Sequence, residues 1–217
     1  GLEPEDAFLM RTVEDALRFK DRLKKNDIKH AVVIGASMAG IKVVEVLHKY
    51  GIETWLLDLA SYIFPLAAYK EVAKEIEKRV EAQGVHLMFG VTIDHMEQEN
   101  GEKTAVLTDG SRIPADIVGL CIGTRAITET VQGEVEIGRG IVVDDHMRTS
   151  VPGIYAAGDC CEGNNLESGQ NQIIGLWANA NHQGETAGIN MAGGDMAYKG
   201  NILHNITHFM NMDFIGF

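Results

Sequence analysis

A glycine-rich loop between an apolar run and an amphipathic segment constrains the fold of this chain more than any other feature. Residues 30–34, HAVVI, are apolar and mostly β-branched, which is typical of a buried parallel strand. Gly35 follows at once, and Gly40 comes five residues later. A helix is predicted from about Ala39 to Tyr50. Strand, glycine turn and helix together predict a βα unit whose helix N-terminus can bind a pyrophosphate.

Each residue of the loop has an expected part in that binding. Gly35 allows the tight turn, and Gly40 lets the helix pack closely on the strand. Ser37 replaces the usual middle glycine, and its hydroxyl can donate to a phosphate. The alternative is a tight turn that binds nothing. The predicted NAD-binding residues of the loop are Gly35, Ala36, Ser37, Met38, Ala39 and Gly40.

An acidic residue stands where a dinucleotide ribose would need one. Asp58 closes the next predicted strand, residues 53–58, and follows Gly35 by 58 − 35 = 23 positions. An acid about 20 residues after the loop accepts a hydrogen bond from the ribose 2′-OH of NAD. From Leu59 to Ala68 there is no Lys or Arg to receive a 2′-phosphate. We therefore expect NADH to be preferred over NADPH; the alternative is an ordinary solvated carboxylate.

The order of the remaining elements in the first half predicts an α/β fold. Helices are expected over 12–25 and 68–83, and a third strand over 85–90. Residues 91–107 alternate around a turn and predict a hairpin, and 116–122 form one more buried strand. This order predicts a Rossmann-like domain with a parallel sheet, helices and a β-meander crossover.

The second half of the chain has fewer regular patterns. Residues 128–140 are rich in Gly and Glu, which predicts a linker or loop. The other expected elements are short strands at 141–143 and 154–157, a helix at 170–191, and a loop-like tail with an apolar end at 195–217.

Composition excludes several classes of protein. The 217 residues allow one large domain or two small ones, and 31 acidic against 19 basic residues give a net charge of −12. Without a basic block, nucleic acid is not an expected partner. No run reaches the roughly 18 apolar residues of a membrane helix, and no signal peptide is visible. Three cysteines without a Cys-x-x-Cys favour a reducing cytoplasm.

Two weaker groupings have structural explanations that are favoured over a functional site: loop cysteines for one pair, and loop histidines or contacts to a missing domain for the other. Cys160 and Cys161 are adjacent, and two loop cysteines are favoured over a strained vicinal disulfide. His204 and His208 have the spacing of metal ligands on a helix, but no third ligand is evident. We therefore predict no metal site.

A longer motif resembles a known family. Residues 149–159, TSVPGIYAAGD, together with the loop at 33–40 and DIVGLCIG at 116–123, resemble the pyridine nucleotide–disulfide oxidoreductase superfamily. Within it the chain is similar to the NADH oxidase, nitrite reductase and rubredoxin reductase group. The opening residues and the tail also look like this group, so the resemblance covers essentially the whole chain.

The resemblance implies NAD(H) and FAD as cofactors. In the family, the aspartate that matches Asp159 bonds a ribityl hydroxyl of FAD; the alternative here is a helix cap. Gly158 receives a packing role at the FAD site, and Gly123 is placed at the NAD site. Hydride would pass from NADH to the flavin and on to an unknown acceptor, either a small molecule or a small electron-transfer protein. The full-length protein is expected to be a cytoplasmic homodimer.

Two departures from the family pattern matter. Lys42 stands where the family commonly has a glutamate near the nicotinamide. No FAD-type glycine loop precedes Thr12, and the family continues beyond Phe217, so we expect an internal piece with unknown catalytic residues. The alternative function is an isolated nucleotide-binding or regulatory module without turnover. The expected domains are a connecting segment and helix at 1–26, an NAD-binding domain at 27–124, and the C-terminal part of an FAD-binding domain at 125–217.

Overall fold

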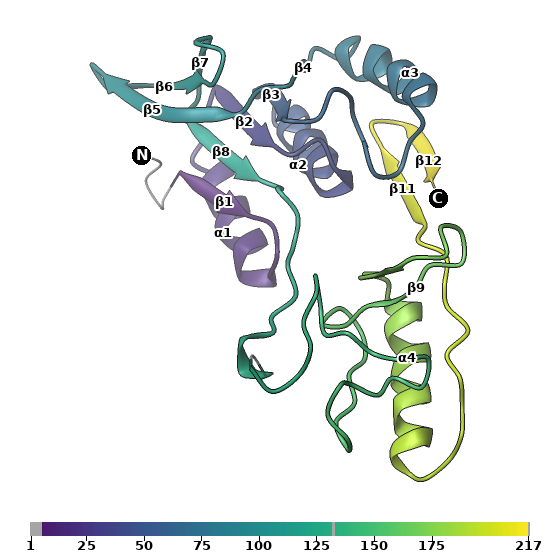
Figure 1. Cartoon of the computed structure of the whole chain (residues 1–217). Coiled ribbons are helices and arrows are strands. Elements are labelled where there is room, and N and C mark those ends of the chain that lie inside the picture. The colour runs from purple at the N-terminus through teal and green to yellow at the C-terminus, as the bar shows by residue number, and fades with distance from the viewer. Residues whose placement is uncertain (1–5, 132, 217) are drawn as a thin grey trace. The chain divides into compact units, whose positions relative to one another are not determined.

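The computed structural model describes residues 6–131 and 133–216 (Figure 1). These residues form two compact units. The first comprises 6–123 with 205–216, and the second comprises the described residues between 124 and 204. No helix within the described ranges is both long and apolar enough to span a bilayer.

A five-stranded parallel sheet forms the centre of the first unit. Its order is β1-β8-β2-β3-β4, so β2 is the middle strand. The predicted strands at 30–34 and 53–58 are confirmed residue for residue. The strands are β1 (Ala7–Leu9), β8 (Ile117–Leu120), β2 (His30–Ile34), β3 (Glu53–Asp58) and β4 (His86–Phe89).

The two faces of this sheet are covered differently. Because successive strand residues point to opposite faces, Val33 and Leu56 pack with the helices, whereas Val32 and Leu57 pack on the other side. That other side is covered by an antiparallel meander, which makes the predicted crossover from β4 to β8. The helices are α1 (Val13–Leu23), α2 (Met38–Lys49) and α3 (Lys70–Glu81), and the meander is β5 (Ile93–Glu99), β6 (Glu102–Leu107) and β7 (Arg112–Pro114).

The segment predicted only to connect and to form a helix, 1–26, contributes more than that. Its β1 pairs in parallel with β8, so it adds an edge strand to the sheet. α1 begins where the sequence predicts because Thr12 caps it. Thr12 Oγ1 accepts from Asp15 N at 3.1 Å, and Asp15 Oδ2 accepts from Thr12 N at 2.9 Å.

The end of the chain forms a β-hairpin, so the expectation of a loop over 195–217 is wrong for these residues. β11 (Asn205–Phe209) pairs antiparallel with β12 (Met212–Gly216). The two residues between them, Met210 and Asn211, have φ of 46° and 60°. Two consecutive positive φ values are typical of a type I′ hairpin turn. Met is unusual at the first of these two positions, so the sequence pattern does not predict the turn.

This tail hairpin, residues 205–216, belongs to the first unit. Phe209, Met210 and Phe214 are all buried in the core on the helical face of the sheet. Figure 1 shows the hairpin in yellow beside α2 and α3. The assignment of all of 125–217 to one domain therefore differs from the structure, because this apolar segment completes the core of the first unit.

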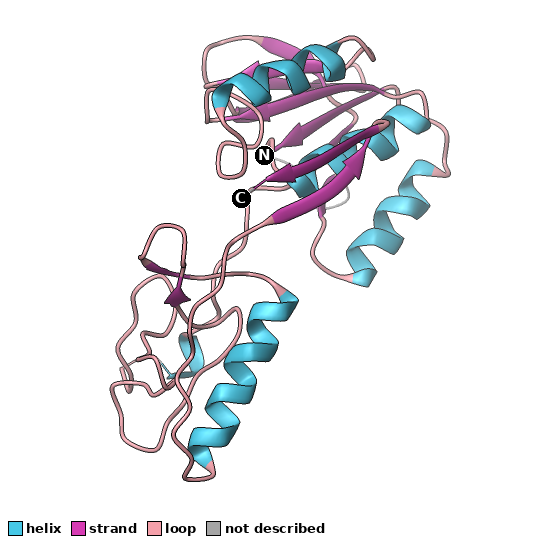
Figure 2. Ribbon diagram, turned by 90° about the vertical axis from the view of Figure 1, so that its right-hand side faces the viewer, coloured by secondary structure: helices cyan, strands magenta, loops and turns pink. Residues whose placement is uncertain are grey.

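The second unit consists mostly of loops around one long helix, α4 (Trp177–Met191) (Figure 2). The helix predicted from residue 170 starts later because β10 (Asn171–Gln172) pairs with β9 (Gly163–Asn164). The strands predicted at 141–143 and 154–157 are also wrong. The structure has only isolated bridges there, such as that between Arg148 and Tyr155.

The Gly- and Glu-rich segment 128–140 is part of this second unit rather than a free linker. It holds a short 3-10 helix, Glu129–Val131, and Val135 is buried. The small core that includes Val135 gathers apolar side chains from loops and from α4. Its buried members are Val135, Ile141, Val143, Met147, Ala156, Cys161, Ala187 and Tyr198.

Candidate functional site

The glycine loop, residues 35–40, lies at the carboxyl edge of the parallel sheet. It follows β2, while Asp58 ends β3 and Cys121 follows β8, the strands on either side of β2. From β2 the chain builds β3 and β4 on one side, and β8 on the other. Open α/β sheets bind ligands at such a switch point. The topology therefore brings the loop and Asp58 together, as the sequence predicts.

The two glycines of the loop have no room for a side chain. Gly35 has φ of +105°, and a Cβ there would lie 2.2 Å from the carbonyl oxygen of Cys121. A Cβ on Gly40 would lie 1.9 Å from the carbonyl oxygen of Gly35. These close approaches let α2 start directly against the sheet. They agree with the turn and packing roles predicted for the glycines, whereas ligand binding stays a prediction.

Ser37 caps α2 and leaves amides open beside it. Ser37 Oγ accepts from Gly40 N and donates to Cys121 O, both at 3.3 Å. Its one proton is thus used inside the protein, which differs from the predicted donation to phosphate. The N–H groups of Met38 and Ala39 precede the first i to i−4 bond of the helix, so they have no helical partner. With the positive end of the helix dipole, they suit a pyrophosphate.

The carboxylate of Asp58 is held against the loop. Its Oδ2 accepts from Ala36 N at 2.6 Å, and its Oδ1 accepts from Ala60 N at 2.8 Å. The Ala36 amide, predicted to bind NAD, is therefore engaged within the protein. A carboxylate offers about four lone-pair sites, so Asp58 keeps acceptor capacity for ribose hydroxyls. The two amides fix the direction in which that capacity points.

Lys42, the departure noted in the sequence, is paired with its surroundings. Its Nζ donates to Glu45 Oε2 at 2.9 Å and to the carbonyl oxygen of His208. Glu45 also accepts from the amide of Met210 at 3.2 Å. Burial raises the pKa of Glu45, but hydrogen bonds from Lys42, Met210 and Lys49 outweigh it, so the pKa is lowered. The ammonium is thus tied to the tail hairpin.

Two more residues complete the edge of the sheet around the loop. Gly123, predicted at the NAD site, has φ of +94° and open space where a Cβ would be. It is the last residue of the first unit before the chain enters the second. Burial raises the pKa of the Cys121 thiol to about 11. Cys121 is therefore protonated at neutral pH and supports the loop by packing and through its carbonyl.

The second predicted motif, Gly158 and Asp159, forms a turn packed on α4. Gly158 has φ of +82°, its N–H donates to Gln183 Oε1 at 2.8 Å, and a Cβ there would lie 3.5 Å from Ala180 Cβ. The Asp159 side chain is exposed beside this turn. Gly158 therefore packs on α4 and Asp159 is exposed; the roles predicted for both at an FAD site stay predictions.

Residues 1–184 match the family model described as pyridine nucleotide-disulphide oxidoreductase. This chain belongs to that family. The match includes both the glycine loop and the Gly158 turn, so the resemblance inferred from the sequence is confirmed.

The relatives include curated proteins and a solved structure from this family. An NADH oxidase of Methanocaldococcus jannaschii is 28% identical over 195 residues, 89% of this chain and 43% of that protein. An NADH oxidase of Enterococcus faecalis is 30% identical over 203 residues, 92% of this chain and 45% of that protein. The water-forming NADH oxidase from Lactobacillus brevis, bound to NADH, is 26% identical with a TM-score of 0.91. The match covers 99% of this chain and 48% of that structure. This chain thus spans less than half the length of these family members.

The adjacent cysteines, Cys160 and Cys161, and the histidines of the tail, His204 and His208, have structural partners. Cys160 and Cys161 are free thiols. The pKa of Cys161 is raised to about 12, and burial is the largest cause. His208 Nδ1 pairs with Asp213 Oδ1 at 2.7 Å, and His204 Nδ1 lies 3.0 Å from the carbonyl oxygen of Ile202. The free thiols agree with the prediction of two loop cysteines, whereas His208 lies in β11 and pairs within the tail hairpin.

His146 links two loops of the second unit. Its Nδ1 lies 2.6 Å from Asp145 Oδ1 and its Nε2 lies 3.0 Å from Asp195 Oδ1. Asp144, Asp145 and His146 place three potential ligand atoms within 4.8 Å, but both acids are exposed. The hydrogen bond to Asp145 is the largest cause that raises the pKa of His146, burial opposes it, and Asp195 adds to it.

The raised pKa of His146 predicts a pH dependence of the second unit. Because the pKa is higher in the folded state, the stabilisation is complete below the ordinary value of 6.5 and is lost as pH rises through the raised value. We expect the second unit to unfold more easily at pH 8 than at pH 6. A His146→Gln variant should lose this difference. Thermal unfolding of both proteins across this range measures it, and an unchanged pH dependence in the variant would contradict the assignment.

Proposed function

We propose that this chain provides the dinucleotide-binding part, and a portion of the flavin-binding part, of an NADH-dependent flavin oxidoreductase. The observation that carries the proposal is the glycine loop at the switch point of the sheet with Asp58 fixed beside it. The NADH oxidases among its relatives, one of them bound to NADH, support it.

The surroundings of Asp58 favour NADH over NADPH. A 2′-phosphate on the ribose would approach a carboxylate that two amides hold in place. No Lys or Arg occurs between Leu59 and Ala68 to neutralise that phosphate. A ribose 2′-OH, by contrast, donates to the free lone pairs of Asp58.

The chain's residues would hold the two cofactors rather than do chemistry of their own. The amides of Met38 and Ala39 bind the pyrophosphate, and Asp58 binds the ribose. Asp159 accepts from the sugar-like chain of the flavin cofactor, with Gly158 giving the close approach. When bound, FAD would take up hydride from NADH and deliver electrons to an acceptor.

The acceptor is proposed only by class: a small molecule or a small electron-transfer protein. Relatives named for different acceptors match at similar identity. They include a rubredoxin reductase of Pseudomonas putida at 29% and a nitrite reductase large subunit of Escherichia coli at 26%. We further propose a cytoplasmic homodimer for the full-length protein.

Titration of the chain with NADH and with NADPH tests the site. We expect saturable NADH binding, at least about tenfold tighter than NADPH, because a factor of ten corresponds to about 1.4 kcal/mol, roughly one charged hydrogen bond. Tighter NADPH binding would overturn the assignment of Asp58. The absorbance of NADH is then followed anaerobically after FAD is added. NADH binding without loss of that absorbance would favour the module without turnover for this chain.

A further inference from the structure

We propose that Phe64 is a positioning residue for the glycine loop, and that the tail hairpin holds Phe64 in place. The inference rests on the proposed function, because it concerns the affinity of the same dinucleotide site. Phe64 lies in the segment between β3 and α3, and nothing in the sequence patterns marks it.

The backbone of Phe64 reaches the loop directly. Its N–H donates to the carbonyl oxygen of Ala36 at 2.9 Å. The Ala36 N–H donates in turn to Asp58 Oδ2 at 2.6 Å. Both polar groups of Ala36 are therefore engaged, one by Phe64 and one by Asp58. These bonds fix the peptide planes on either side of Ala36, just before the open amides of Met38 and Ala39.

Phe64 makes this bond from an unfavourable backbone conformation. Its φ is +56°, a left-handed value that is rare for a bulky residue. Such a conformation persists only where the surroundings over-determine it. The carbonyl oxygen of Phe64 accepts from the amides of Ala67 and Ala68, each at 2.9 Å, which forms a local turn. The residue as a whole is only 2% exposed, so the packing around Phe64 supplies the remaining support.

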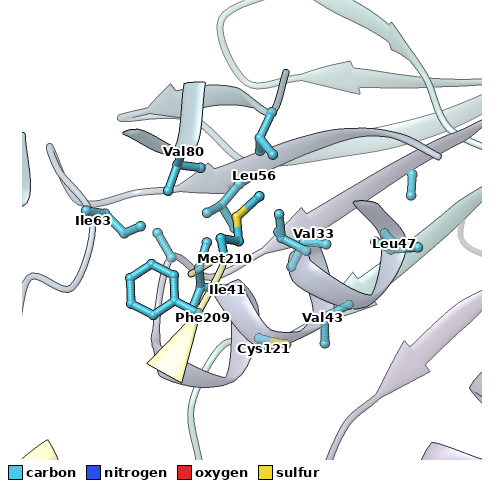
Figure 3. Close-up of a cluster of buried hydrophobic side chains, with 14 of the residues drawn as sticks. Val33, Ile41, Val43, Leu47, Leu56, Ile63, Val80, Cys121, Phe209 and Met210 are labelled. Carbon is cyan, nitrogen blue, oxygen red and sulfur yellow. The ribbon is translucent and has the colours of Figure 1, made fainter. Parts of the chain in front are cut away.

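That packing comes from the tail hairpin. The Phe64 ring meets Phe209 edge-on, with centroids 5.4 Å apart and planes at 88°, and meets Phe214 at 5.2 Å and 46°. Aromatic pairs at these separations stabilise beyond their buried area. Figure 3 shows Phe209 among the side chains of Ile41 and Ile63. Phe209 and Phe214 of the tail hairpin thus hold the ring of Phe64, and the backbone amide of the same residue contacts the loop.

The hairpin is also anchored on α2 and on the residues that follow α3. The amide of Met210 donates to Glu45 on α2 at 3.2 Å, and its carbonyl accepts from Gln83 Nε2 at 3.2 Å. Lys42 adds its bond to the carbonyl of His208. Because α2 begins at the glycine loop, the hairpin is tied to the loop through both Phe64 and α2. We therefore expect the hairpin to influence NADH affinity although none of its residues contacts the ligand.

Replacing one aromatic of the hairpin tests this, with a matched pair elsewhere as control. Phe209→Ala removes the partner of Phe64. Phe19→Ala removes a comparable aromatic partner in the same unit. The ring of Phe19 on α1 meets the ring of Phe8 edge-on, with centroids 5.3 Å apart. We expect Phe209→Ala to raise the Kd for NADH about 3- to 10-fold, the worth of one hydrogen bond. Phe19→Ala should leave that Kd within about twofold. Phe209→Leu should recover part of the affinity.

Amide hydrogen exchange gives a reading that does not depend on the ligand. The Phe64 N–H should exchange faster in Phe209→Ala. In Phe19→Ala its exchange rate should equal that of the wild type once the change in the free energy of unfolding is taken into account. An unchanged Phe64 rate in Phe209→Ala, or an equal change in both variants, overturns the inference. Unchanged NADH affinity despite faster exchange also overturns it. If Phe209→Ala does not fold, Phe209→Leu and Phe214→Leu are compared with Phe19→Leu in the same way. Absence of NADH binding to the wild-type chain would count against the proposed function, while the exchange rates still decide whether the hairpin holds Phe64.

Discussion

A Gly35→Ala variant is expected to lose NADH binding and to destabilise the first unit strongly. An alanine Cβ would lie 2.2 Å from the carbonyl oxygen of Cys121 and 2.6 Å from its carbonyl carbon. Both are backbone atoms of the segment after β8. Backbone atoms cannot avoid the contact by a change of rotamer, as a side chain can. Overpacking costs about 1–3 kcal/mol or more, and a left-handed alanine adds about 1–2 kcal/mol.

The two contributions can be separated with a second glycine. Gly51, just after α2, has φ of +71° but nothing within 4 Å of a Cβ. Gly51→Ala should therefore show only the conformational cost, and its NADH affinity should equal that of the wild type. Denaturant unfolding and NADH titration of both variants make the comparison. If Gly35→Ala bound NADH as tightly as Gly51→Ala, the loop would not be the binding site.

An Asp58→Ala variant is expected to weaken NADH binding by tenfold or more. It should also reduce the ratio of the Kd for NADPH to the Kd for NADH. Hydrogen bonds to charged groups contribute about 1.5–3 kcal/mol, and about 1.4 kcal/mol is a factor of ten. The variant also leaves the amides of Ala36 and Ala60 without their acceptor, so the loop loses its support. NADPH should be affected less, because the repulsion of its 2′-phosphate disappears with the carboxylate.

Asp116 offers a matched control at the opposite edge of the sheet. Its Oδ2 accepts from the amides of Lys29 and His30, at 2.8 Å and 2.9 Å, where β2 begins. Asp116→Ala therefore also removes a carboxylate from two backbone amides. It should lower the free energy of unfolding by a similar amount and leave the Kd for both nucleotides unchanged. Equal loss of NADH affinity in the two variants would mean that Asp58 acts only through stability.

The sequence predicted the parts of this molecule whose signal is local. The run at 30–34 and the glycines after it are sufficient to place β2, the loop and α2, because strand burial and tight turns leave dense local patterns. Asp58 was found by its spacing. The fold class and the meander crossover followed from the order of these elements.

The parts that were missed depend on contacts between distant segments. Nothing around Phe64 shows that its amide supports the loop, because its partners Phe209 and Phe214 lie about 150 residues away. The hairpin turn at Met210 and Asn211 lacks the glycine that usually marks one. The apolar character of the tail was the only sequence signal for this hairpin. It indicated that the tail is buried, but not which part of the chain it packs against.

The division of the first unit into two separate stretches of chain affects the order in which the protein can assemble during synthesis. The sheet has all its strands once β8 has been made, yet Phe64 still lacks the aromatic rings that cover it. Those rings arrive only after the whole second unit has left the ribosome. Domains generally fold as units as they emerge, so the first unit keeps an exposed apolar face until residues 205–216 have been made and cover it.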